Sequence, residues 1–320
     1  MTNPTQNEDL DLHALSPHLR SPEAAIKYLE RLRWPNGPVC PHCAESERKH
    51  YHLKTQSRPT RKLWKCAACR KQFSVTVGTI FEDSKISLDK WLLAFHLLCS
   101  SKKGMSALQI QRMLKLGSYK SAWHMLHRIR WAMAEPAFRS RMSGTVEADE
   151  TYIGGKPRNR KKRYQGVQKK TGRGTDKAPV TVLVERGGRA RSAHIANVSG
   201  DEVKNVIRRH VDTEARIMTD AFRSYAGLDR EFASHETVSP IDEWVRGDVH
   251  TNTAENFFAI LKRGINGVYH HVSEAHLHRY LSEFDFRYNN RQANGVDDAE
   301  RTRRAIVGAE GKRLMYADSR

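Results

Sequence analysis

The apolar and polar positions divide the chain into a helical start, a turn-rich stretch, a second helical stretch and a long mixed region. The first twenty residues are polar and aperiodic, which predicts a loose arm. A short amphipathic helix then follows, because Ser21 is placed as an N-cap, Pro22 occupies the first helical position and Pro35 stops the pattern. Residues 36–83 are rich in turn residues and β-type runs, which predicts a small module of hairpins.

Residues 87–140 return to helical periodicity, with a predicted N-cap at each of three starts, Ser87, Ser106 and Ser118. Beyond residue 144 the pattern changes to short apolar strands, interrupted by a polar helix near 200–210 and followed by further helices. The tail after about residue 295 is predicted to form one helix and a loose end. This order indicates a mixed α/β region with a helical end.

The charge of the chain changes this picture by pointing to a partner. Lys and Arg number 55 against 36 Asp and Glu, a formal charge of +19, which is typical of proteins that bind a polyanion such as nucleic acid. A merely basic surface is the alternative. No apolar run approaches the roughly 18–20 residues of a membrane span, and the start lacks the features of a secretory signal. We therefore expect a cytoplasmic protein without membrane contact.

Four of the five cysteines form two pairs that indicate a metal site. Cys40 and Cys43 are separated by 22 residues from Cys66 and Cys69, and C-x2-C repeated at such a distance is typical of a zinc ribbon. Four thiolates make a closed tetrahedral site, so we predict one structural Zn²⁺. Redox or buried cysteines are the alternative. Cys99 lies on an apolar helix face and is expected to be a core thiol.

The helices around Gly117 have the spacing of a helix-turn-helix. Lys120, His124, Arg128 and Arg130 give the second helix a basic character beside an apolar set, as in a recognition helix of the DNA major groove. A plain helical hairpin with a solvated basic face is the alternative. Directly after the first long strand, residues 156–177 hold ten Lys or Arg and one acid. This basic loop, with Lys161, Lys162 and Arg163, is expected to contact DNA, and a solvated hairpin tip is its alternative.

Acidic residues in three separate segments are candidates for catalysis. In the strand VEADETYIGG, alternation puts Glu147 and Asp149 on one face and Glu150 on the other, and periodicity alone does not choose between Asp149 and Glu150. Asp220 ends a second apolar strand, and Glu255 begins a helix. Lys262, seven residues after Glu255, shares its helix face. Two strand carboxylates and one helix carboxylate suit two Mg²⁺ or Mn²⁺ ions in phosphoryl transfer, with the lysine gripping a phosphate.

The complete order of motifs resembles the insertion-sequence transposases that join an N-terminal zinc ribbon to a D-D-E catalytic domain. It runs over residues 20–293 and comprises the two cysteine pairs, FSVTVGTIFEDSKISLDKW, VEADETYIGGK, MTDAFRSY, HTNTAENFFAILKRGI and YHHVSEAHLHRYLSEFDFRYNNR. The resemblance implies a multi-domain α+β chain whose ribonuclease H-like α/β domain carries the triad Asp149, Asp220 and Glu255, with Lys262 as basic partner.

Some relatives carry asparagine at the third acid position, and Asn252 and Asn256 flank Glu255 here. The seven-residue step to Lys262 favours Glu255. Asn252 is a neighbour of the metal ligands, a phosphate contact or an N-cap, and His250 either approaches the metal site or the substrate or is structural. Glu147 and Glu150 are expected to serve salt bridges or face solvent.

Five parts are predicted: a loose arm, 1–20; a short helix and zinc ribbon, 21–83; a helical DNA-binding segment, 84–142; a ribonuclease H-like D-D-E domain, 143–294; and a C-terminal helix and tail, 295–320. The resemblance implies a nucleoid-associated transposase that binds double-stranded DNA, at terminal inverted repeats and target, and catalyses strand cleavage and strand transfer as a homo-oligomer on paired ends. The alternatives are a non-catalytic zinc-ribbon DNA-binding regulator, as a repurposed transposase, and a stand-alone metal-dependent nuclease.

Overall fold

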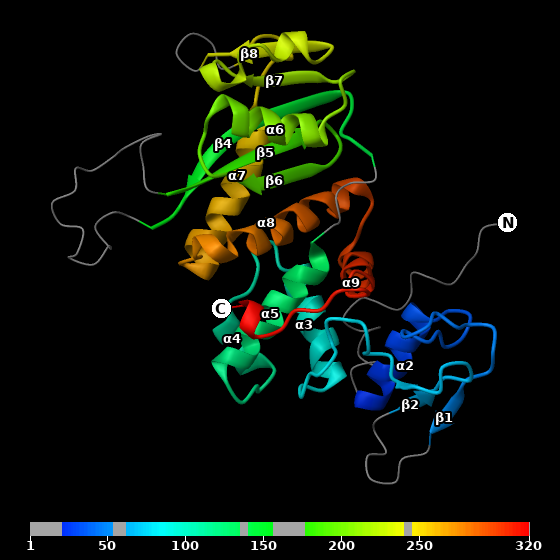
Figure 1. The fold of residues 1–320 in the computed structure, drawn as a ribbon. Helices are drawn as coiled ribbons and strands as arrows, with labels where there is room; N and C mark the ends of the chain where they lie inside the picture. The colour runs from blue at the N-terminus through cyan, green and yellow to red at the C-terminus, as the bar shows by residue number, and fades with distance from the viewer. Residues whose placement is uncertain (1–20, 54–61, 135–139, 156–176, 240–244, 320) are drawn as a thin grey trace. The chain divides into compact units, whose positions relative to one another are not determined.

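The computed structural model describes residues 21–53, 62–134, 140–155, 177–239 and 245–319. The chain folds as two compact units, one formed by residues up to Ala134 together with those from Asn290 onward, the other by Glu135–Asn289. The predicted arm and the core of the basic loop, with Lys161, Lys162 and Arg163, lie outside the described residues. Figure 1 labels most helices and strands of both units.

The first unit begins with helix α2 (Pro22–Arg33), whose first turn is capped by the Ser21 hydroxyl, which accepts the Ala24 N–H at 3.2 Å. A small antiparallel sheet follows, with strands β1 (Tyr51–Leu53), β2 (Leu63–Lys65) and β3 (Gln72–Phe73). The predicted hairpin module is thereby confirmed.

Three helices follow the ribbon, α3 (Leu88–Ser100), α4 (Ala107–Met113) and α5 (Tyr119–Met133). Ser106 and Ser118 cap their helices through side-chain hydrogen bonds, as predicted. Ser87 stands at the predicted position, but its side chain makes no cap bond.

The C-terminal residues belong to this first unit. Helix α9 (Asp298–Val307) packs against α3 and α5. The buried Arg301 guanidinium donates to the Cys99 carbonyl at 3.0 Å, and Lys312 donates to the Ala132 carbonyl at 3.0 Å. The prediction of a loose end is therefore wrong for the described residues after α9, because Lys312 binds a carbonyl of α5, 180 positions earlier.

The second unit is built on a five-stranded mixed sheet in the order β6-β5-β4-β7-β8. The strands are β4 (Thr145–Ile153), β5 (Ala178–Glu185), β6 (Ala190–His194), β7 (Arg216–Asp220) and β8 (Ser234–Val238). The first three strands pair antiparallel, whereas β7 lies parallel to β4 and to β8. The first strand is thus central and beside the fourth, which confirms the predicted ribonuclease H-like arrangement.

Helices cover both faces of this sheet (Figure 1). Helix α6 (Gly200–His210) packs on the face of Val146, Ala148 and Ile217. Helices α7 (Asn252–Gly264) and α8 (Glu274–Asn289) pack on the face of Val180, Val182 and Val184. Single turns complete the two units: η4 (Arg223–Tyr225), η5 (Leu228–Arg230), the π-helix η6 (Ile265–Tyr269), η7 (Gln292–Asn294) and η8 (Ala317–Ser319). In the described part of the chain, no helix combines the length and apolarity needed to cross a membrane.

Candidate active site and zinc site

The four predicted zinc ligands form one compact cluster in the first unit. Their sulfurs all lie within 4.8 Å of one another, with 3.7 Å between Cys40 and Cys69 and between Cys43 and Cys66. A tetrahedron with Zn–S bonds of about 2.3 Å has edges of about 3.8 Å, so this thiol set fits one Zn²⁺ without an open position. Cys99 is buried and lies apart, as expected of a core thiol.

Two of the candidate carboxylates lie level on neighbouring strands of the second unit. Strands β4 and β7 run parallel with Glu147 opposite Met218, so two residues further along each strand bring Asp149 level with Asp220. Both side chains point to the same face of the sheet, because residues two apart share a face. This is the face that α7 covers.

The third candidate, Glu255, lies in the first turn of α7 and is exposed. Lys262 lies near the end of the same helix, also exposed, with its ammonium 5.9 Å from the centre of the Phe258 ring. Seven residues make nearly two turns, so the two side chains share one helix face. The structure thus brings a helix acid and a lysine to the sheet face that carries the strand acids.

The charges of these groups act on one another. The pKa of Asp149 is raised to about 7, first by burial and then by the negative charges of Asp220 and Glu255, while the Glu150 N–H and the positive charge of Lys262 oppose the rise. Three carboxylates concentrated in this way create a negative site, and hard oxygen donors are the ligands that Mg²⁺ and Mn²⁺ prefer. The donor set therefore fits divalent cations.

The carboxylate oxygens are spaced more widely than the cysteine sulfurs. Among the described residues, the four cysteines are the sole group of three or more metal-ligating side chains whose donor atoms all lie within 4.8 Å. Glu255 is exposed on its helix. The Glu255 side chain can therefore change its rotamer. Asp149, in contrast, is held by its strand, and its carboxylate accepts the Glu150 N–H at 2.7 Å.

Glu150 points to the opposite face, toward Tyr225 in the α6 core. The pKa of Tyr225 is raised well above its usual value by burial, by the charges of Glu150 and Asp149, and by a hydrogen bond to Glu150. Glu150 therefore has a protein partner behind the strand. Of the two acids that periodicity could not rank, Asp149 faces α7 and Glu255.

Glu147 has a larger role than sequence reasoning gave it. Its side chain is completely buried, pairs with Arg186 at 2.7 Å and accepts the backbone N–H groups of Thr253 and Ala254 at 2.7 and 3.1 Å. The expected salt bridge exists, but the contact with α7 went unpredicted. Strand alternation placed Glu147 beside Asp149, yet no local signal linked it to residues 106 positions later.

The beginning of α7 bears on two of the alternatives. The helix starts at Asn252 and its N-cap residue is Thr251, so Asn252 is not the cap. The His250 ring lies 2.9 Å from Arg186 and 3.3 Å from Glu147, and these contacts agree with the structural alternative.

The basic residues predicted to contact DNA differ in their accessibility. Lys120 is exposed at the start of α5. Arg128 is only 7% exposed, donates to the Glu82 carbonyl and lies over the Trp91 ring at 5.4 Å. Arg130 is buried as well. The prediction for Arg128 is thereby corrected: the helix turns this side chain into the core, where its hydrogen bond and ring contact offset part of the cost of burial.

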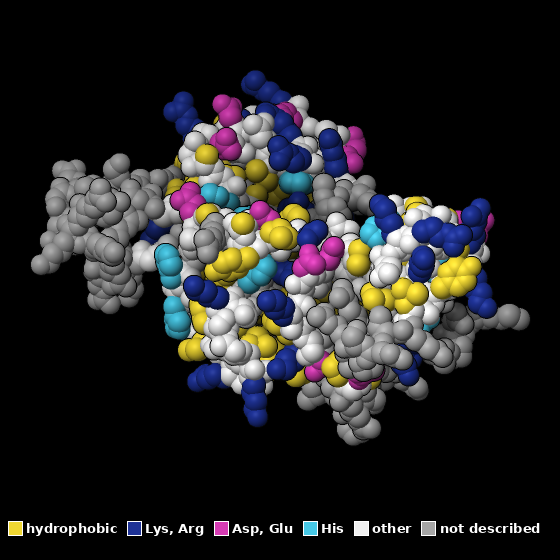
Figure 2. Space-filling model, turned by 60° about the horizontal axis from the view of Figure 1, so that its bottom comes forward, with side chains coloured by type: hydrophobic (Ala, Val, Ile, Leu, Met, Phe, Trp, Pro, Cys, Tyr) yellow, Lys and Arg dark blue, Asp and Glu magenta, His cyan; other side chains and the backbone are white. Residues whose placement is uncertain are grey.

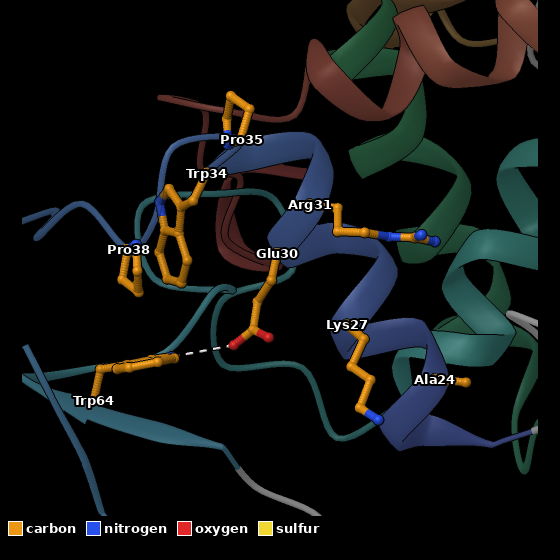
Figure 3. Close-up of a pocket in the computed structure, with 8 residues that line it drawn as sticks. All are labelled: Ala24, Lys27, Glu30, Arg31, Trp34, Pro35, Pro38 and Trp64. Atoms are coloured by element: carbon orange, nitrogen blue, oxygen red, sulfur yellow. Dashed lines mark hydrogen bonds between the residues drawn. The ribbon is translucent and has the colours of Figure 1, made fainter. Parts of the chain in front are cut away.

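On the face in Figure 2, the Lys and Arg side chains of the described residues are scattered among acidic and apolar ones. A groove of about 750 Å³ in the first unit offers a second kind of surface (Figure 3). It is lined by Ala24, Lys27, Glu30, Arg31, Trp34, Pro35, Pro38 and Trp64. Glu30 binds Lys62 and the Trp64 indole N–H, each at 3.1 Å, so its charge is already paired. Lys27 and Arg31, four positions apart on α2, are exposed.

Comparison with known proteins agrees with this arrangement. A family model described as the ISXO2-like transposase domain matches residues 141–289, and one described as the transposase zinc-ribbon domain matches residues 20–72. Together with the ribbon and the sheet, these matches define the class of D-D-E transposases. The chain belongs to its IS1595 family with an N-terminal zinc ribbon.

Individual relatives cover different shares of the chain. A protein from Halobacterium salinarum, described as an uncharacterized protein in transposable element ISH50, is 31% identical over 278 residues, 83% of this chain and 90% of its own length. An uncharacterized transposase-like protein from Haemophilus influenzae is 28% identical over 96 residues, 30% of this chain and 77% of its own.

A solved structure of the simian T-cell lymphotropic virus intasome in complex with PP2A regulatory subunit B56 gamma contains a chain with 15% identity and a TM-score of 0.27. The match covers 53% of this chain and 63% of that one. Similarity of this degree supports no conclusion about fold or function.

Proposed function

We propose that this protein is a transposase that binds the ends of its insertion sequence and catalyses metal-dependent DNA cleavage and strand transfer. The observation that carries the proposal is the meeting of Asp149 and Asp220, level on parallel strands, with Glu255 on the helix that covers the same face. Membership of a D-D-E transposase family supports the same assignment.

Asp149, Asp220 and Glu255 would hold two Mg²⁺ or Mn²⁺ ions. Such ions, when bound, activate the attacking oxygen and stabilise the leaving oxygen. In the first step water attacks a phosphodiester at the element end, so that a P–O bond forms, the bond to the 3′ oxygen breaks and a free 3′-hydroxyl results. In the second step this hydroxyl attacks a phosphodiester of the target. Lys262 would neutralise a strand phosphate beside the acids.

The predicted parts of the chain would divide the work. The ribbon and helices of parts 21–83 and 84–142 would hold the element ends, and part 143–294 would carry out the chemistry. Lys120 and the basic loop, with Lys161, Lys162 and Arg163, would contact phosphates, as would Lys27 and Arg31 at the groove in Figure 3. Two or more copies would assemble on paired ends.

The test is a strand-transfer assay with labelled element-end DNA, a target plasmid and Mg²⁺. Wild type is compared with Asp149→Ala, Asp220→Ala and Glu255→Ala, and Asn256→Ala serves as the neighbouring control. Loss of joined product in the three acid variants supports the transposase. Cleavage without joining favours the stand-alone nuclease, and end binding without either reaction favours the regulator. Full activity of Glu255→Ala together with loss in Asn256→Ala would refute the third acid.

A further inference from the structure

The completely buried Glu147 lies between the strand that carries Asp149 and the helix that carries Glu255. We propose that Glu147 is a positioning residue, which holds Glu255 in place opposite Asp149 and Asp220 by capping α7 from the sheet. The inference rests on the proposed function, since it concerns the geometry of the same three acids.

The first turn of α7 depends on this capping. Its N-cap residue, Thr251, makes no side-chain cap bond. Glu147 Oε2 instead accepts the N–H groups of Thr253 and Ala254, and Oε1 accepts the Thr253 hydroxyl at 2.9 Å. A carboxylate at a helix N-terminus satisfies free N–H groups and meets the positive end of the helix dipole, and both effects are stronger away from water.

The position of this contact links it to the candidate site. Glu255 directly follows Ala254, so the amides that Glu147 binds belong to the same turn as the helix acid. Glu147 also precedes Asp149 by two residues on β4, and both side chains point to one face of the sheet. The Glu147 carboxylate thus connects the strand that carries Asp149 to the first turn of the helix that carries Glu255.

A second set of contacts fixes the segment that leads into α7. Arg186, just after β5, donates from Nε to Glu147 at 2.7 Å and from Nη1 to the Asp248 carbonyl at 2.7 Å. Its Nη2 lies 2.9 Å from His250 Nδ1. The guanidinium therefore ties the 248–250 segment to the same buried carboxylate.

A purely structural role is the competing explanation, and the second unit contains a matched control for it. Glu283 on α8 is also completely buried and paired with an arginine, Arg287, at 2.9 Å. It accepts the Tyr269 hydroxyl at 2.6 Å. These contacts lie on α8 and η6 rather than on the first turn of α7. Removing either charge should weaken folding, but only Glu147 should affect Glu255.

The experiment measures Mn²⁺ binding by electron paramagnetic resonance on the zinc-loaded full chain, at a temperature where circular dichroism shows each variant folded. Glu147→Gln keeps the size of the side chain but turns an N–H₂ group toward either the helix amides or Arg186. We expect Glu147→Gln to weaken Mn²⁺ binding by about 10- to 100-fold, the range found when residues that orient metal ligands are replaced. Glu283→Gln should bind Mn²⁺ like wild type, and Asp149→Asn should lose the site.

Wild-type Mn²⁺ affinity in folded Glu147→Gln would overturn the positioning role. If that variant does not fold, Glu147→Asp decides, because it keeps the charge but cannot reach both helix amides; weaker binding supports the proposal and unchanged binding refutes it. Strand transfer measured on the same proteins separates the two ideas. Mn²⁺ binding that depends on Asp149 and Glu147 without any DNA reaction would refute the transposase and retain the positioning role. Strand transfer by the wild type, with unchanged Mn²⁺ affinity in Glu147→Gln, would support the transposase and refute the positioning role. A wild type that binds no Mn²⁺ would refute both proposals.

Discussion

Asp149 and Asp220 lie level on two parallel strands, and the negative charge of Asp220 helps to raise the pKa of Asp149 to about 7. Neighbouring negative charges in a largely buried site oppose folding, but the same charges attract cations. A site arranged for metal binding should therefore be destabilising in the metal-free protein.

Asp149→Asn should accordingly stabilise the protein in Mg²⁺-free buffer while abolishing strand transfer. The folded-state pKa of Asp149 lies above its unfolded value, so the loss of stability grows as pH rises from about 4 to 7 and is complete above 7. We expect a gain on the order of 1–3 kcal/mol at pH 8, since one pKa unit is about 1.4 kcal/mol. The gain should shrink toward pH 4. Thermal melts over this pH range would check it, and a gain independent of pH would contradict the electrostatic cause.

Histidine burial predicts a second pH effect of opposite sign. Burial, with the charges of Arg191 and Arg209, lowers the pKa of His210 to about 4, so the unfolded state binds the extra proton first. Stability should therefore be fully present above pH 6.5 and fall as pH drops toward 4. His210→Gln should reduce this acid sensitivity in urea unfolding at pH 5 and 7. Equal sensitivity of wild type and variant would exclude His210 as a cause.

Zinc content should follow the ribbon cysteines alone. Metal analysis of the purified chain should find about one zinc per chain, and Cys66→Ser should lose the metal together with the ribbon fold, because three thiolates no longer close the site. Cys99→Ala is the control, since this thiol lies in the core. Retention of zinc in Cys66→Ser would refute the assignment.

Replacement by alanine should affect DNA binding at Lys120 and stability at Arg128. Lys120→Ala should weaken DNA binding and lower the slope of log affinity against log salt by about one, because one phosphate contact is lost. Arg128→Ala should leave that slope unchanged but destabilise the first unit by about 3 kcal/mol, through lost packing on Trp91 and an unpaired Glu82 carbonyl. Salt-dependent binding assays and urea unfolding separate the two. A lower slope of log affinity against log salt for Arg128→Ala would show that Arg128 contacts DNA after all.

Replacing Arg301 should show how far the C-terminal helix supports the first unit. Its buried guanidinium donates to carbonyls of Cys99 and Asn290, which Arg301→Met would leave without this donor. We expect a loss of about 2–5 kcal/mol in urea unfolding. Arg303→Met, on the half-exposed side of the same helix, should have a much smaller effect. Equal effects of the two variants would show that burial of Arg301 is unimportant.

The sequence by itself determined the features whose physics is local. The C-x2-C spacing limits where two thiolates can point, Ser106 and Ser118 cap helices within three residues, and seven residues place Glu255 and Lys262 on one face of α7. Strand alternation likewise put Glu147 and Asp149 together. Each of these relationships spans two helical turns or fewer, so periodicity records it.

Only the tertiary structure decided the relationships between distant segments. Parallel pairing of β4 with β7 brings Asp149 level with Asp220, and packing gives Glu147, expected only to form a salt bridge or face solvent, a buried contact with the first turn of α7. Packing also buries Arg128 in the core and places α9 against α3. These outcomes depend on which faces are buried against each other across more than 40 residues, and a local pattern of apolar and polar positions carries no information about that choice.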